Sequence, residues 1–272
     1  MKNYLRALSF LTIIPLPFVR FDPEGRELSD SAACFPLAGA TLGLLIAAFA
    51  WLLLQLFPPA PVVVMALIFS FFLTRGLHFD GLADTADGLI GTTSREKAFK
   101  AMEDSAIGVM GAAAILFVYL LKFALLLEFG RPSLVFAFLL MPLAGRWAIV
   151  YAGAWFGPAR DRGLGDLFLR GLRWPVLLKA SLLSFLLLYL FACWQTPLAI
   201  PVITGCLMAL AAAHLLAFYA SRRLGGINGD ILGACSEIGE LFFLIGLYLA
   251  LHYSNGAEFL AKAVICYVQG VC

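Results

Sequence analysis

Long apolar runs separated by short polar stretches are the main pattern along this chain of 272 residues. A helix needs about 20 predominantly apolar residues to cross the hydrocarbon core of a bilayer. Runs of this kind, of which the second and the last are short, cover residues 35–57, 62–77, 107–127, 133–155, 175–194, 198–219 and 238–253. The pattern predicts an all-α, polytopic transmembrane helix bundle of about seven spans, with six to eight allowed.

Composition supports a membrane protein and excludes several other classes. Hydrophobic residues make up 62% of the chain and charged residues only 13%. A soluble domain is about 25% charged, and disordered chains are more polar still. The formal net charge of +2 gives no electrostatic basis for a nucleic-acid partner. We therefore expect one integral-membrane domain over residues 1–272, in contact with membrane lipid.

The distribution of basic residues predicts the orientation. Most of the 19 Lys and Arg residues lie before the first run or in the segments after the second, fourth and sixth runs. Loops rich in Lys and Arg stay in the cytoplasm. The N-terminus and these segments are therefore expected on the cytoplasmic side of the cell (inner) membrane. Residues 1–34 contain an apolar stretch that Pro15 and Pro17 interrupt, which favours an interfacial segment over a signal peptide.

Three aspartates follow the second run at helical spacing. Asp80, Asp84 and Asp87 stand at i, i+4 and i+7, so a helix would place them on one face. Carboxylates so close repel one another unless a cation lies between them. Mg²⁺ takes oxygen ligands and usually keeps waters and substrate phosphates as well. The spacing favours a metal site over the alternative, a solvated polar face.

Two further polar residues lie after these aspartates in the same predicted cytoplasmic segment. Asp104 and Ser105 stand directly before the third run, where an acid could also serve only to complement a helix dipole. With the aspartates they define an acidic segment, 78–106.

A second acidic segment, 221–237, contains Gly226 and Asn228 in a glycine-rich turn. Such a turn can point backbone N–H groups at an anion, or it can be a simple connector. Asp230 and Glu237 follow it at i and i+7, again one helical face. We expect the two segments to form a shared active site.

Two basic side chains add to these candidates. Arg146 lies well inside the fourth run, where a charge needs a partner. That partner is an anionic group of a substrate or a carboxylate from another helix. His78 adjoins the aspartates and could act as a general base or contact a phosphate.

The polar blocks together resemble a known family. The segments 10–17, 35–39, 80–87, 104–111, 145–146 and 225–237 are similar, in this order, to the motifs of the cobalamin synthases. These enzymes are adenosylcobinamide-GDP ribazoletransferases, also called cobalamin-5'-phosphate synthases. The resemblance covers nearly the whole chain, which makes it more specific than any single motif.

The resemblance implies a reaction and its substrates. The family joins α-ribazole, or α-ribazole 5'-phosphate, to adenosylcobinamide-GDP with release of GMP, and requires Mg²⁺. The product is adenosylcobalamin or its 5'-phosphate. The acceptor's phosphorylation state and the oligomeric state, a homo-oligomer included, stay open.

The residue patterns and the family resemblance together assign an expected role to each candidate residue. The catalytic candidates are Asp80, Asp84, Asp87 and Asp104. The expected metal ligands are Asp80, Asp84, Asp87, Asp230 and Glu237. The expected substrate contacts are His78, Ser105, Arg146, Gly226 and Asn228.

Three other functions compete with this interpretation. A CDP-alcohol phosphotransferase also uses clustered aspartates, but the sequence after Asp87-Gly88 does not follow that family's motif. A prenyltransferase with aspartate-rich motifs is another alternative. A secondary transporter would carry its acids near the membrane midplane, whereas these acids are expected at cytoplasmic ends.

Overall fold

The chain folds into a bundle of helices. The computed structural model describes residues 1–16, 26–160 and 164–269, with the backbone alone for 254–269. Over these ranges all regular structure is helical apart from one isolated bridge between Pro158 and Ile227. The predicted all-α class is confirmed.

Six helices are long and apolar enough to cross a membrane, and a bent pair brings the number to seven if it counts as one span. The first spanning helix combines α2 (Arg26–Ser31), the turn η1 (Ala32–Cys34) and α3 (Phe35–Leu53). The other five are α7 (Val109–Leu127), α8 (Arg131–Trp155), α10 (Trp174–Trp194), α11 (Ala199–Leu224), which the turn η2 (Thr196–Leu198) precedes, and α12 (Gly229–Gln269).

The bent pair replaces the second predicted span. It consists of α4 (Pro59–Thr74) and α5 (Leu77–Leu89), which meet at an angle of 90°. The break falls at Arg75 and Gly76, whose φ angles are 54° and 66°. This left-handed conformation ends the hydrogen-bonding pattern of one helix and lets the next start in a new direction. A single continuous span over 62–77 is therefore wrong, and the aspartates lie on a separate helix.

The last span begins earlier than its hydropathy suggests. The predicted range was 238–253, whereas α12 begins at Gly229 and continues as one helix to Gln269. Glu237 and Glu240 lower the hydropathy of its first turns, but both carboxylates have basic partners inside the bundle. The apolar tail predicted over 259–271 belongs to this helix as far as 269, and its end lies outside the described residues.

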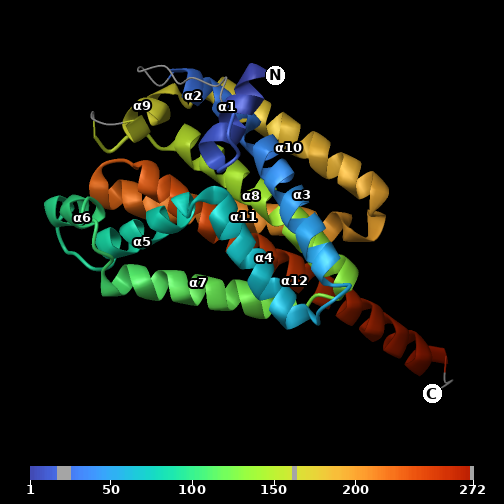
Figure 1. The fold of residues 1–272 in the computed structure, drawn as a ribbon. Coiled ribbons are helices and arrows are strands. Elements are labelled where there is room, and N and C mark those ends of the chain that lie inside the picture. Colours follow the sequence, from blue (N-terminus) through green and yellow to red (C-terminus); the bar gives the residue numbers. More distant parts are fainter. Residues whose placement is uncertain (17–25, 161–163, 270–272) are drawn as a thin grey trace.

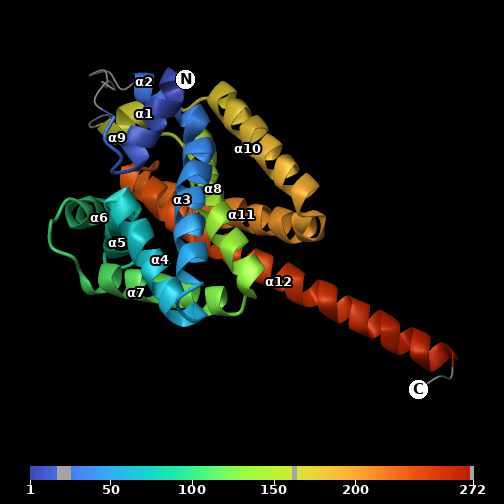
Figure 2. The ribbon, with the colours of Figure 1, turned by 45° about the vertical axis from the view of Figure 1, so that its right-hand side comes forward.

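The short helices gather at one end of the bundle, near the starts of α7 and α12, and the C-terminus extends away from the opposite side (Figures 1 and 2). They are α1 (Lys2–Leu11), α2, α6 (Arg95–Met102) and α9 (Leu164–Gly171). Helix α1 buries Ala7, Leu8 and Leu11 along one side, which is typical of an amphipathic helix at an interface. The predicted segment 1–34 lies partly outside the described residues, because 17–25 are not among them.

Two long helix pairs form the core. Helix α3 packs along α8, and α11 packs along α12. Helix α12 also contacts α5, α7 and α8, so it is the element that joins the aspartate helix to the rest of the bundle. Its contacts determine where the polar groups of the chain meet.

Reporter fusions test the orientation that the basic loops predict. Fusions at Ser94 and Gly225 should give cytoplasmic signals, and fusions at Gly130 and Gln195 should report the opposite side, because basic segments resist translocation. The measurement is the activity of a compartment-specific reporter on each full-length fusion. A signal from the far side at Ser94 would contradict the orientation.

Candidate active site

Helix α5 brings its aspartates against the start of α12. A Cβ atom added to Gly81 would lie 2.7 Å from the backbone oxygen of Asp230 and 3.1 Å from the Cα of Gly233. Only a glycine allows two helices to approach so closely. Asp80 is exposed and Asp84 is half-buried on the same helix. The crossing therefore places Asp230 beside the aspartate face, as the sequence predicted.

Asn228 organises the first turn of α12. Its Oδ1 accepts a hydrogen bond of 3.1 Å from the backbone N–H of Ile231, the geometry of a helix N-cap. Its Nδ2 donates a hydrogen bond of 2.8 Å to Oδ2 of Asp230. Asn228 thus starts the helix and orients the carboxylate, and its role as a substrate contact stays a prediction.

Gly226 allows two loops to pack together. Its φ is 156°, and an added Cβ would lie 2.6 Å from the backbone of Pro158 and Ala159. The backbone N–H of Ile227 donates to the carbonyl of Gly157 over 2.9 Å, and its carbonyl accepts from Ala159 over 2.8 Å. Close packing accounts for this glycine, and the N–H group of Ile227 is already bound. Anion binding by Gly226 itself stays a prediction.

Three neighbouring cavities share the carboxylates of these two helices. The first, of about 320 Å³, is lined by both Asp80 and Asp230. The second, of about 890 Å³, is lined by Asp80, Asp84, Asp104 and Ser105. The third, of about 240 Å³, shares Asp230 with the first and Glu103 with the second. Asp80 therefore lies where the first and second cavities meet, and Asp230 lies where the first and third meet.

The carboxylates of these cavities have no ion-pair partner in the described part of the chain. Of the described basic side chains, none forms an ion pair with Asp80, Asp84 or Asp230, although Arg160 lines the third cavity with Asp230. The repulsion among these carboxylates favours the binding of a cation. Among the described residues, no three acids, histidines or cysteines are close enough to hold a metal by themselves. Oxygen ligands that Mg²⁺ shares with water and substrate phosphate fit this arrangement.

Asp87 has a structural partner in addition to its place on the aspartate face. Its two carboxylate oxygens accept hydrogen bonds from the backbone N–H groups of Gly108, at 2.7 Å, and Gly111, at 2.9 Å. Both donors belong to the first turn of α7, where unpaired N–H groups and the helix dipole attract an anion. Asp87 therefore fixes α7 against α5, and its metal-binding role stays a prediction.

A network of buried charges lies deeper in the bundle. Lys122 of α7 donates to Glu237 over 2.7 Å and to Glu240 over 2.8 Å, both on α12. Arg146 of α8 donates to Glu240 as well. All four side chains are buried. Two cations and two carboxylates balance in charge, which a low-dielectric interior requires.

The contacts of Arg146 identify its charge partner and connect the network to α5. Its partner is a carboxylate from another helix, Glu240, one of the two alternatives that the sequence left open. Its Nη2 lies 3.2 Å from Nδ1 of His78. A guanidinium can only donate, so Nδ1 is the acceptor and a neutral His78 carries its proton on Nε2. His78 lines the first cavity, and its role as a general base or a phosphate contact stays a prediction.

Seven of the predicted site residues line these cavities, and four do not: Asp87, Arg146, Gly226 and Glu237. Asp104 and Ser105 are exposed on the wall of the second cavity, and Asp104 accepts a bond of 3.0 Å from the backbone N–H of Ala106. Glu237 lines none of the three cavities. Its ion pair with Lys122 accounts for its charge without a metal, and its role as a metal ligand stays a prediction.

Sequence reasoning missed Lys122 and Glu240. Two signals could have found them: a lysine inside an apolar run, and two glutamates three residues apart where such a run begins. Each requires a buried counter-charge. The helices that supply these counter-charges are determined by tertiary packing. The spacing of residues along the chain does not reveal that packing.

Comparisons with known proteins agree with the resemblance. A family model described as cobalamin-5-phosphate synthase matches residues 3–248. A protein of Desulfitobacterium hafniense named adenosylcobinamide-GDP ribazoletransferase is 35% identical to this chain, over 93% of it and 98% of the relative. A protein of Roseiflexus sp. with the same name is 39% identical over 90% of this chain and 88% of its own length. No solved structure matches this chain.

Replacing Asp87 by Asn tests its structural role. Asn keeps one acceptor oxygen but turns an NH₂ group toward the first turn of α7, so we expect the free energy of unfolding to fall by about 1–3 kcal/mol. The measurement is detergent unfolding followed by circular dichroism, without divalent cations. The control is Asp104→Asn, an exposed acid, which should change stability by less than about 0.5 kcal/mol. Equal stability of the two variants would contradict the proposed cap.

Proposed function

Because the chain belongs to the cobalamin-5-phosphate synthase family, we propose that it acts as an adenosylcobinamide-GDP ribazoletransferase at the carboxylates that line these three cavities. The reaction joins α-ribazole, or its 5'-phosphate, to adenosylcobinamide-GDP and releases GMP. The assignment to this site rests on one observation. Helix α5, which carries Asp80 and Asp84, crosses α12 at Asp230.

The arrangement of cavities suits a reaction of two substrates. A ribose hydroxyl of the nucleoside attacks the phosphorus on the corrinoid side of the diphosphate. One oxygen–phosphorus bond forms, the bond from that phosphorus to the bridging oxygen breaks, and GMP leaves with the electron pair. The two reacting groups need to meet at one place from separate cavities. We assign the hydroxyl proton to Asp80, because its carboxylate lines both the first and the second cavity.

Basic and polar side chains of the second cavity suit the diphosphate. Arg75 lines this cavity beside Asp80, and no described acid pairs with it. Its φ of 54° is unusual for a residue other than glycine and costs about 1–2 kcal/mol. Strained residues of this kind are found most often at functional sites. We assign Arg75 to the negative charge of the diphosphate and Ser105 to a hydrogen bond with it.

The proposal includes a divalent cation, Mg²⁺. Asp80, Asp84 and Asp230 would supply ligands to it together with water and substrate phosphate, with Asp87 and Glu237 as the further ligands that the sequence suggests. When bound, Mg²⁺ offsets the charge of the diphosphate and of the departing GMP. Hydrogen bonds within the protein already orient two of these carboxylates, Asp230 through Asn228 and Asp87 through α7.

Membrane placement forms part of the proposal. The site lies at the end of the bundle where the short helices gather, and the basic loops flank that end (Figure 1). The positive-inside rule then orients the site toward the cytoplasm of the cell (inner) membrane. Both nucleotide substrates would reach it from that side.

The assay that tests this function uses the full-length protein in detergent with adenosylcobinamide-GDP, α-ribazole and Mg²⁺. We expect a corrinoid product and GMP in equal amounts, loss of turnover on chelation, and recovery when Mg²⁺ is restored. Asp84→Asn and Asp230→Asn should each lower kcat/KM by about 100-fold, or ~2.7 kcal/mol of transition-state stabilisation. Chromatography of both products measures the rate.

A matched control is Glu96→Gln, an exposed acid of α6 that lines none of the three cavities. It should keep the rate of the unchanged protein. Absence of product from the unchanged protein would refute the function. Product formation with normal rates in both aspartate variants would refute the site and leave the function standing.

A further inference from the structure

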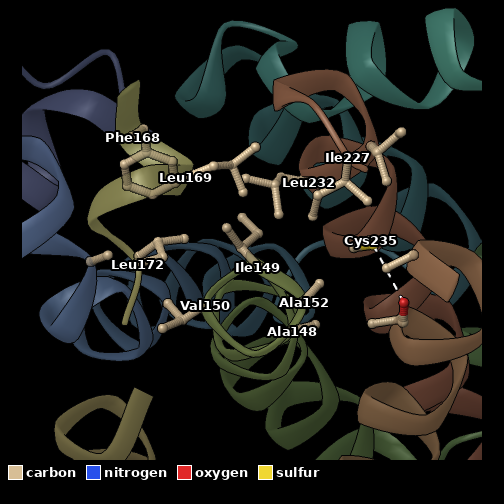
Figure 3. Close-up of a cluster of buried hydrophobic side chains, with 14 of the residues drawn as sticks. Ala148, Ile149, Val150, Ala152, Phe168, Leu169, Leu172, Ile227, Leu232 and Cys235 are labelled. Atoms are coloured by element: carbon tan, nitrogen blue, oxygen red, sulfur yellow. Dashed lines mark hydrogen bonds between the residues drawn. The ribbon is translucent and has the colours of Figure 1, made fainter. Parts of the chain in front are cut away.

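The first cavity has aromatic walls. Phe10 of α1, Phe35 of α3 and Phe168 of α9 line it, and the rings of Phe35 and of its two neighbours are nearly parallel. Ring centroids are 6.0 Å apart for Phe10 and Phe35 and 5.7 Å apart for Phe35 and Phe168. Ile149 and Leu232 complete the apolar surface. Phe168, Ile149 and Leu232 converge from three helices (Figure 3).

Polar groups of this cavity are few and lie together. Asp80 and Asp230 stand where it joins the other two cavities, and both are acceptors. His78 contributes an N–H donor, since its Nδ1 accepts from Arg146. The cavity thus combines flat apolar walls with two carboxylates and one donor. This combination matches a flat, neutral heterocycle that carries hydroxyl groups at one end.

We propose that this cavity binds the benzimidazole nucleoside, the acceptor substrate of the reaction, with its base against the phenylalanine rings. The inference rests on the proposed function. Aromatic rings prefer stacked or edge-on contacts at centroid distances of 4.5–7 Å, which the three phenylalanines can offer to a further ring. The ribose hydroxyls would donate to Asp80 and Asp230, and the unsubstituted ring nitrogen would accept from His78.

Other occupants fit the cavity less well. A corrin macrocycle is too large for a volume of about 320 Å³, whereas the second cavity is almost three times as large and opens beside Asp84. The nucleoside in the first cavity and the corrinoid diphosphate in the second would meet at Asp80.

Two variants of the cavity wall test this assignment. Gly229 lines the cavity, and among the described residues a Cβ added there would find only the Cα of Gly165 within 4 Å, at 4.0 Å. Gly229→Leu therefore narrows the cavity. Phe168→Leu removes one ring from α9, which lines the first cavity and not the second, and keeps an apolar side chain. The control is Phe117→Leu, the same substitution at an exposed position of α7.

The measurements are the two KM values of each full-length variant and the binding of α-ribazole to each by calorimetry without the other substrate. Gly229→Leu and Phe168→Leu should raise the Kd and KM of α-ribazole about tenfold, a loss of ~1.4 kcal/mol. The KM of adenosylcobinamide-GDP should change by less than about twofold. Phe117→Leu should leave the two KM values and the Kd of α-ribazole unchanged.

Three results would overturn the inference. The KM of adenosylcobinamide-GDP could rise in place of that of α-ribazole, which would assign the cavity to the donor substrate. Both variants could release bound phospholipid with unchanged constants for α-ribazole, which would assign it to an acyl chain. Unchanged constants in both variants would leave the cavity without a role in binding. Failure of the proposed function is distinct, because the unchanged protein would then make no product.

Discussion

The neutralisation of four buried charges is the constraint on which the site depends. Lys122, Arg146, Glu237 and Glu240 come from α7, α8 and α12, and two cations there face two carboxylates. An unpaired charge in a membrane interior is costly, so these helices can pack only in an arrangement that satisfies all four. The network therefore selects the relative positions of α7, α8 and α12, and through His78 it also reaches α5.

The position of α5 has chemical consequences. Contact between Gly81 and α12 brings the carboxylates of Asp80 and Asp84 beside Asp230, and Asp87 fastens the same helix to α7. Mutual repulsion opposes this arrangement, and the energy to hold it comes from packing and from the hydrogen bonds around it. The result is a set of carboxylates without ion pairs among the described residues, where the first cavity adjoins the other two.

Much of this could be predicted from the sequence, and the rest depends on packing. The spans, the helix that carries the aspartates and the approach of Asp230 follow from hydropathy, spacing and motif order. The early start of α12 does not, because hydropathy treats a charge as unfavourable whether or not it has a partner. The break at Arg75 depends on backbone torsion angles, and the partner of Arg146 depends on helix packing, and hydropathy reports neither. The sequence leaves Gly226 as part of an anion-binding turn or of a connector, whereas its contact with another loop is visible only in three dimensions.

A double-mutant cycle on Lys122 and Glu237 tests the central claim most directly, with unfolding of the purified protein measured in detergent. Lys122→Met and Glu237→Gln each leave one buried charge unbalanced and should each cost about 3 kcal/mol. The double variant again holds one cation and one carboxylate, Arg146 and Glu240, and should lose much less than the sum of the two single losses. Losses that simply add would contradict a charge-balanced network as the basis of the helix arrangement.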